Sequence, residues 1–197
     1  AERGIHFEGP WREAEIDLVT GVLARYADHL GEDRLLDLKE KAILTGTDGR
    51  TATLTFIREP NNNAVTAYYV RNYGRVRIHD NLFDQAYVDA NYPWRFEDAL
   101  EAAPSGPISD QRFIIGHELG HMIIHGLRAE YAASQQPPTY LEDLYGDTLE
   151  MDDWAHPIHG TNESMASEIA LWVFEVERRV AVEAFNETHL TPALLTP

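Results

Sequence analysis

One segment constrains the fold of this chain more than any other: residues 109–126, which predict a helix that is apolar on most of its sides. A helix without a polar face has to lie in the centre of a domain, with other elements packed around it. Two histidines and a glutamate nevertheless interrupt its apolar run between Phe113 and Ile124. Polar side chains in a buried helix are costly unless something compensates them, so these three need a chemical reason. The apolar side chains of the segment are Phe113, Ile114, Ile115, Leu119, Met122, Ile123 and Ile124.

The interruption is His117-Glu118-Leu119-Gly120-His121, which matches the pattern H-E-x-x-H. Residues four apart lie about 40° apart around a helix, so the two imidazoles face one point and can share one zinc ion. Glu118 lies about 100° round from His117, where its carboxylate can act as general base on a water at the open position of the metal. The spacing therefore predicts a zinc site with His117 and His121 as ligands and Glu118 as the catalytic base.

The third ligand has to come from another part of the chain. His125 continues the four-residue spacing, but about 12 Å of helix separates it from His117, too far for one ion. We expect His125 near the helix end, because Gly126 is a typical terminator. Residues 162–166 open a later helix with a carboxylate followed by small residues, and this makes Glu163 the candidate third ligand.

Other acidic and histidine residues leave alternatives open. Glu163 could instead be an ordinary first-turn glutamate stabilised by the helix dipole. His156 and His159, in the loop before that helix, could supply a ligand or a transition-state donor, although a loop surface is their commoner place. Glu168 falls on the opposite side of the helix from Glu163, among other charged residues, which predicts a solvated face. An acidic stretch lacks the regular spacing of a calcium loop and is expected to be solvated; it comprises Glu142, Asp143, Asp147, Glu150, Asp152 and Asp153.

Composition narrows the chemistry further. The chain has no cysteine, so any metal must be held by nitrogen and oxygen. Its 33 acidic and 16 basic residues give a formal charge of -17, which repels nucleic-acid backbones, and we expect no nucleic-acid partner. No apolar run approaches the ~20 residues that cross a bilayer, so no membrane association is expected. The first residue, Ala1, is consistent with a processed chain, so the compartment stays open.

The order of helical and β-rich segments predicts an α+β fold. We find no internal repeat and no linker, so we expect a single domain over residues 1–197. Periodicity and chain breakers predict helices at 11–30, 34–39, 81–103 (in two pieces), 109–126 and 163–185, and three or four short antiparallel strands within 43–79. The expected architecture is a short, twisted, mainly antiparallel sheet packed on an active-site helix and a glutamate helix.

The residues around the H-E-x-x-H pattern resemble a known family. Residues 112–125 are similar to the active helix of ImmA/IrrE-type peptidases, and residues 74–78 are similar to the strand that precedes it there. Residues 163–170 are similar to the E-x-x-A-x-x-F-A segment of that family, although residues 173–176 depart from its usual L-L-x-P. More broadly, H-E-x-x-H followed by N-E-x-x-A is the pattern of gluzincins. Both resemblances imply a zincin-like fold with zinc ligands from two histidines and Glu163. The resemblance to ImmA/IrrE-type peptidases also implies Glu118 as the base and a cytoplasmic location.

The leading interpretation is a zinc-dependent endopeptidase that hydrolyses a protein or peptide substrate. The alternative is a zinc-containing regulatory or binding protein that contacts one protein partner without turnover. Glu118 favours the enzyme, because a structural zinc site uses four closed ligands and has no use for a base. We expect the substrate to lie extended along an exposed strand, for which Arg75–His79 is the candidate, and the oligomeric state is not determined.

Overall fold

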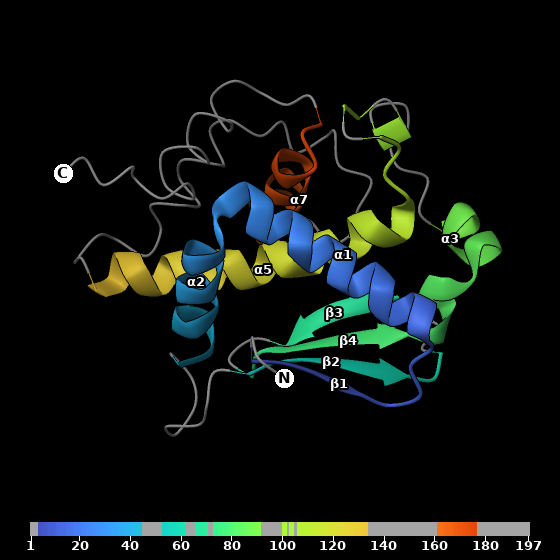
Figure 1. The fold of residues 1–197 in the computed structure, drawn as a ribbon, viewed down its shortest axis with the longest axis horizontal. Helices are drawn as coiled ribbons and strands as arrows, with labels where there is room; N and C mark the ends of the chain where they lie inside the picture. Colours follow the sequence, from blue (N-terminus) through green and yellow to red (C-terminus); the bar gives the residue numbers. More distant parts are fainter. Residues whose placement is uncertain are drawn as a thin grey trace.

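In the computed structural model the chain has an α+β fold, with its main helices over one face of a small sheet (Figure 1). The structure describes residues 4–44, 53–61, 66–70, 73–91, 100–101, 103–104, 106–133 and 161–176. In chain order, the elements are β1 (Ile5–Glu8), α1 (Glu13–Leu30), α2 (Glu32–Leu44), β2 (Leu54–Glu59), β3 (Ala67–Val70), β4 (Arg75–His79), the 3-10 helix η1 (Asp80–Phe83), α3 (Gln85–Asn91), α5 (Asp110–Ala133) and α7 (Thr161–Val173). None of the helices in these ranges is long and apolar enough to span a membrane.

The described sheet is mixed, so the expectation of a mainly antiparallel sheet is wrong. Its strand order is β1-β2-β4-β3, with β1 parallel to β2, β2 parallel to β4, and only β3 antiparallel to β4. Two helices separate β1 from β2, and such a crossover connects parallel strands, whereas the tight turn at Gly74 joins β3 and β4 as a hairpin. β4 enters the sheet between β2 and β3, so Arg75–His79 is an inner strand and not the edge. The sequence pattern also missed β1.

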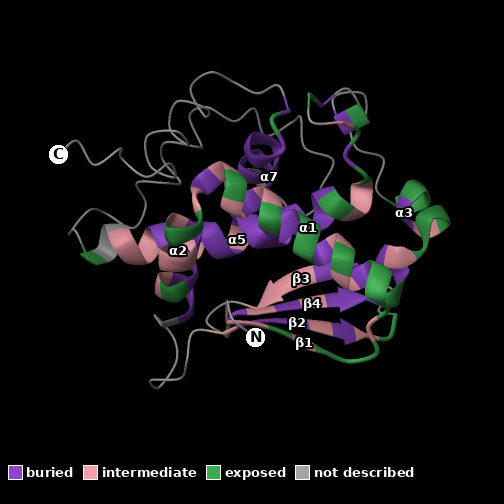
Figure 2. Cartoon of the chain, viewed as in Figure 1, coloured by how far each residue is buried: buried purple, intermediate pink, exposed green. Residues whose placement is uncertain are grey.

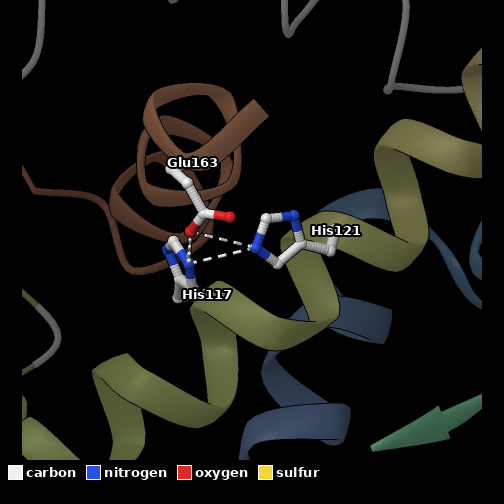
Figure 3. Close-up of side chains that lie close together, drawn as sticks. All are labelled: His117, His121 and Glu163. Carbon is white, nitrogen blue, oxygen red and sulfur yellow. Dashed lines mark hydrogen bonds and ion pairs between the residues drawn. The ribbon is translucent and has the colours of Figure 1, made fainter. Parts of the chain in front are cut away.

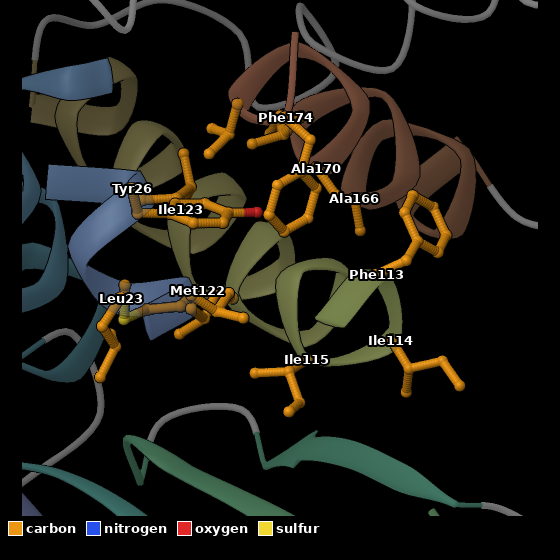
Figure 4. Packing of buried hydrophobic residues seen from close by; sticks show 14 of the residues in the cluster. Leu23, Tyr26, Phe113, Ile114, Ile115, Met122, Ile123, Ala166, Ala170 and Phe174 are labelled. Carbon is orange, nitrogen blue, oxygen red and sulfur yellow. The ribbon is translucent and has the colours of Figure 1, made fainter. Parts of the chain in front are cut away.

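Helix α5 is the centre of the core, as its apolar pattern predicts. It packs against α1, α2, α7 and β3, and Figure 2 shows that its middle part is buried. Figure 4 shows side chains of α5 interleaved with Tyr26 of α1 and with Phe174 at the end of α7. The Tyr26 hydroxyl donates a 2.6 Å hydrogen bond to the carbonyl oxygen of Gly116, inside this core.

Two glycines explain why α5 approaches its neighbours so closely. A Cβ at Gly120 would lie 2.5 Å from the carbonyl oxygen of Ala166 in α7, and a Cβ at Gly126 would lie 2.4 Å from the carbonyl oxygen of Leu38 in α2. Gly126 does not end the helix, contrary to the expectation, and α5 continues to Ala133. The glycine is therefore explained by close helix packing, which a pattern of helix terminators cannot distinguish from a C-cap.

Helix α7 ends earlier than expected, at Val173, and not near Phe185. The amide of Val176 bonds to the carbonyl of Leu171, and Glu175 adopts a left-handed φ of 58° while its amide bonds to Trp172. This is the Schellman arrangement, which closes a helix, and it occurs here without glycine. Residues 177–185 lie outside the described part of the chain.

The remaining helix predictions hold in outline. Helix α1 ends before Gly31, as predicted, and α2 is longer at both ends than the expected segment 34–39. The first expected piece of 81–103 corresponds to η1 and α3. The second piece falls mostly on residues 92–99, outside the described residues.

Candidate metal centre

The three side chains expected to bind zinc meet where α5 crosses the start of α7 (Figure 3). His117 and His121 project from the middle of α5, and Glu163 lies in the first turn of α7. The Nε2 atoms of the two histidines are 3.2 Å apart. The Oε2 atom of Glu163 lies 3.0 Å from the Nε2 atom of His117 and 3.4 Å from that of His121.

These separations and these donor atoms fit a zinc ion. With ligand bonds of about 2.0–2.1 Å and tetrahedral angles, zinc needs donor atoms about 3.3 Å apart, and the three separations bracket this value. Two imidazoles and one carboxylate are a ligand set of catalytic zinc, which keeps its fourth position for water or substrate. Among the described residues, this is the one group of histidine and acidic side chains that could hold a metal.

Small residues bring the two helices together at this point. The clearance between Gly120 and the backbone of Ala166 leaves no room for a side chain, so α5 and α7 touch backbone to backbone next to the site. Ala166, Ser167 and Ala170 of α7 are buried, and their small side chains permit this close approach on the side of the helix that carries Glu163. Close approach is required because the short Glu163 side chain has to span the remaining distance.

Ser167 holds the second ring nitrogen of His117. Its hydroxyl oxygen lies 2.9 Å from the Nδ1 atom of His117, and its side chain is buried. A partner on Nδ1 fixes the ring and leaves Nε2 for the metal. For His117 this partner comes from α7. A serine one turn after the glutamate is the sequence signal that could have identified it.

The three side chains are strongly coupled electrostatically. Burial tends to raise the pKa of the Glu163 carboxyl, but hydrogen bonds and charge from His117 and His121 outweigh it and hold that pKa well below its usual range. Burial tends to lower the pKa of His121, but the hydrogen bond to Glu163 and the charges of Glu118 and Glu163 raise it overall, against a smaller opposing effect of Arg128. The site therefore favours the charged form of the Glu163 carboxylate, which is the form that binds a metal ion.

Glu118 lies beside the cluster but is held by a different element. Its carboxylate is buried, and its Oε2 atom accepts a 2.6 Å hydrogen bond from the backbone amide of Tyr69 in β3. The amide is on the outer side of β3, because β4 occupies the other side. No sequence pattern pointed to Tyr69, since the bond uses its backbone and depends on where the strand lies.

His125 is not part of the cluster, as its distance along the helix predicts. Its ring stacks on the Tyr69 ring, with centroids 5.8 Å apart and planes at 26°. Because α5 runs two turns beyond His125, this histidine is not at the helix end as we expected. It faces the edge strand instead.

The solvated environment expected for Glu168 is wrong. It is 5% exposed, so it does not lie on a solvated face, and it is not in the His117 cluster. Glu175 does lie on the surface, where it pairs with Arg25. Glu168 lies away from the Glu163 side of α7, as its helical angle predicts, but other parts of the protein cover that side. His156, His159 and the acidic stretch 142–153 lie outside the described residues.

Comparison of the chain with known protein families, with curated proteins and with solved structures finds no match. The function of the chain is therefore inferred from the geometry and chemistry of the site.

Proposed function

We propose that the chain is a zinc-dependent metallopeptidase with a zincin-like fold, related to the gluzincins and to ImmA/IrrE-type peptidases. The observation that carries the proposal is the meeting of His117, His121 and Glu163 at separations that suit tetrahedral zinc, with Glu118 beside them. Two of these residues come from one helix and the third from a helix 42 positions later in the chain. Chance placement of that set, with Ser167 holding the second nitrogen of His117, is a poor explanation.

Each residue has a defined role in peptide hydrolysis. A zinc ion at this site would lower the pKa of a water molecule and polarise the carbonyl of the scissile bond. Glu118 would accept the proton of the attacking water and deliver it to the leaving amine. The amide of Tyr69 orients the Glu118 carboxylate through Oε2, so the proton passes through Oε1. Ser167 keeps His117 in the tautomer that presents Nε2.

The substrate would lie along β3 and not along β4, which corrects the strand that we expected. β3 is an edge of the described sheet, next to α5, and its outer side faces Glu118. An extended peptide added to this edge would form hydrogen bonds with outward backbone groups of β3 other than the Tyr69 amide, and would pass over the metal centre. The proposed substrate is therefore a protein or peptide, and the proposed activity is that of an endopeptidase.

A zinc-containing regulatory or binding protein remains the second candidate. It would use the same three ligands but would have no need for Glu118, which costs free energy in a buried position. The two candidates therefore differ in what a change at Glu118 does to the protein.

The deciding experiment combines metal analysis with digestion of a peptide library by the wild type and by Glu118→Gln. If the chain is a peptidase, we expect about one zinc per chain in both proteins. Cleavage by the variant should be at least ~10²-fold slower than by the wild type, because only proton transfer is removed. Zinc in both proteins with no cleavage by either would support the binding protein. Equal cleavage by both would refute Glu118 as the base.

A further inference from the structure

The face of α5 that carries the metal ligands continues towards the C-terminal end of the helix. Arg128 follows His117 by eleven residues, about three turns, and so returns to within about 20° of it around the axis. Side chains on a helix lean towards its N-terminus, so the Arg128 guanidinium leans back towards His121. The two are close enough for the charge of Arg128 to act on the His121 ring.

Tyr69 and His125 lie beside this face, on the β3 side. The Tyr69 ring stacks on His125, so an aromatic pair bridges the helix and the edge strand along which the proposed substrate lies. The Tyr69 hydroxyl is buried and makes no hydrogen bond within the described ranges. Buried hydroxyls in native proteins nearly always have a partner, so one without a partner requires an explanation. A bound ligand that accepts a hydrogen bond would provide it.

The residues that extend the metal-binding face differ in charge from the chain as a whole. The chain carries a formal charge of -17, yet the two residues that extend the metal-binding face are a histidine and an arginine. The acidic residue that follows on α5, Glu130, is turned towards α2, where it pairs with Arg34 at 2.7 Å and with Lys41 at 3.0 Å. Positive charge is therefore placed beside the metal centre, while this carboxylate is held on another side of the helix.

We propose that Arg128, His125 and the Tyr69 hydroxyl form a carboxylate-binding subsite beside the metal centre. A guanidinium binds a carboxylate through two parallel hydrogen bonds, and a phenol and an imidazole can donate further ones. His125 lies about 6 Å beyond His121 along the helix, the length of about two residues of an extended peptide. Preferred substrates thus present a carboxylate about two residues from the scissile bond, an inference that rests on the proposed function.

The carboxylate can belong to an acidic side chain or to the C-terminus of the peptide. Three pools of fluorescent peptides separate these sources: one with glutamate at a fixed position and an amidated end, one with glutamine there and an amidated end, and one with glutamine and a free end. Binding is measured by anisotropy with zinc-loaded Glu118→Gln protein, so that no pool is consumed. A side-chain carboxylate is the source if the first pool binds most tightly, and a C-terminal carboxylate is the source if the third does.

The expected result is that a carboxylate pool binds about tenfold more tightly than the glutamine amide pool. Adding Arg128→Gln should reduce this preference to less than about twofold, with the zinc content unchanged. Arg112→Gln is the matched control, because Arg112 is exposed on α5 about 140° away from His117 and should leave the preference intact. His125→Gln should weaken the preference without abolishing it.

Three outcomes would overturn the subsite: equal binding of all pools, binding of none, or a preference that survives Arg128→Gln. A preference that survives Arg128→Gln would mean that the carboxylate binds the zinc ion and not the proposed subsite. Absence of peptide cleavage by the wild type would count against the proposed function alone, because the binding measurement does not depend on turnover.

Discussion

Replacing Gly120 by alanine should damage the metal site through the backbone, without touching a ligand. The added Cβ would lie 2.5 Å from the carbonyl oxygen of Ala166 and 2.9 Å from its Cα atom, both in the backbone of α7. An ordinary contact needs about 3.4 Å or more, so α5 and α7 must separate by roughly 0.5–1 Å. Glu163 moves with α7, whereas zinc tolerates errors of only about 0.2 Å in its ligand distances.

The expected change in the free energy of unfolding is the difference between two opposing contributions. Alanine gains about 0.5–1 kcal/mol over glycine inside a helix, and forcing a group into a packed contact costs about 1–3 kcal/mol. Gly120→Ala should therefore lower the free energy of unfolding of the metal-free protein by about 1–2 kcal/mol. Its zinc affinity should fall by about tenfold or more, because the separation exceeds what the ligand distances tolerate.

Two other glycines of the chain serve as controls. Gly126→Ala creates a similar clash, 2.4 Å from the carbonyl oxygen of Leu38, but it acts against α2 and should destabilise the protein while leaving zinc affinity nearly unchanged. Gly21→Ala meets no atom within 4 Å and should stabilise the protein by about 0.5–1 kcal/mol. Unfolding would be followed in urea with a chelator present, and zinc affinity by competition with a coloured chelator. Normal zinc affinity in a destabilised Gly120→Ala protein would refute the argument.

Three further predictions concern side chains of the site and its support. Glu163→Ala should weaken zinc binding by at least about tenfold in the same competition assay, whereas Glu168→Ala should leave it nearly unchanged; the reverse result would overturn the ligand assignment. Ser167→Ala should lower zinc affinity by about tenfold, because His117 loses the partner that orients its ring, and an unchanged affinity would show that the serine is dispensable. The third prediction concerns pH: burial would raise the pKa of Glu130, but the hydrogen bonds and charge of Arg34 and a neighbouring lysine lower it. Because its pKa is lowered in the folded state, ionised Glu130 stabilises the protein at pH values above the ordinary glutamate pKa, and this stabilisation is lost as the pH falls through the folded-state pKa. The loss of unfolding free energy caused by Arg34→Gln, measured in urea, should therefore become smaller between pH 6 and pH 3. A loss that stays constant over this range would contradict the prediction.

The sequence by itself determined the features that depend on local periodicity. The apolar run around His117 and His121 identified a buried central helix, and four-residue spacing is enough to place two imidazoles on one side of it. Glu163 could be predicted as the third zinc ligand because it is followed by small residues, which suit close packing between helices. These inferences need only the geometry of one helix, which is the same in any fold.

Tertiary structure alone decided everything that depends on how distant segments meet. The order of the sheet placed β3, and not Arg75–His79, at the edge, because β4 enters between β2 and β3. The partner of Glu118 is a backbone N–H, which every residue except proline carries, so the residue type gave no sign that Tyr69 would be the partner. Gly126 matches a helix terminator in sequence and serves as a packing contact in the fold, because only the position of α2 distinguishes the two. Glu168 is buried for the same kind of reason: a helical angle gives the direction of a side chain, but the elements packed around it decide whether that direction leads to solvent.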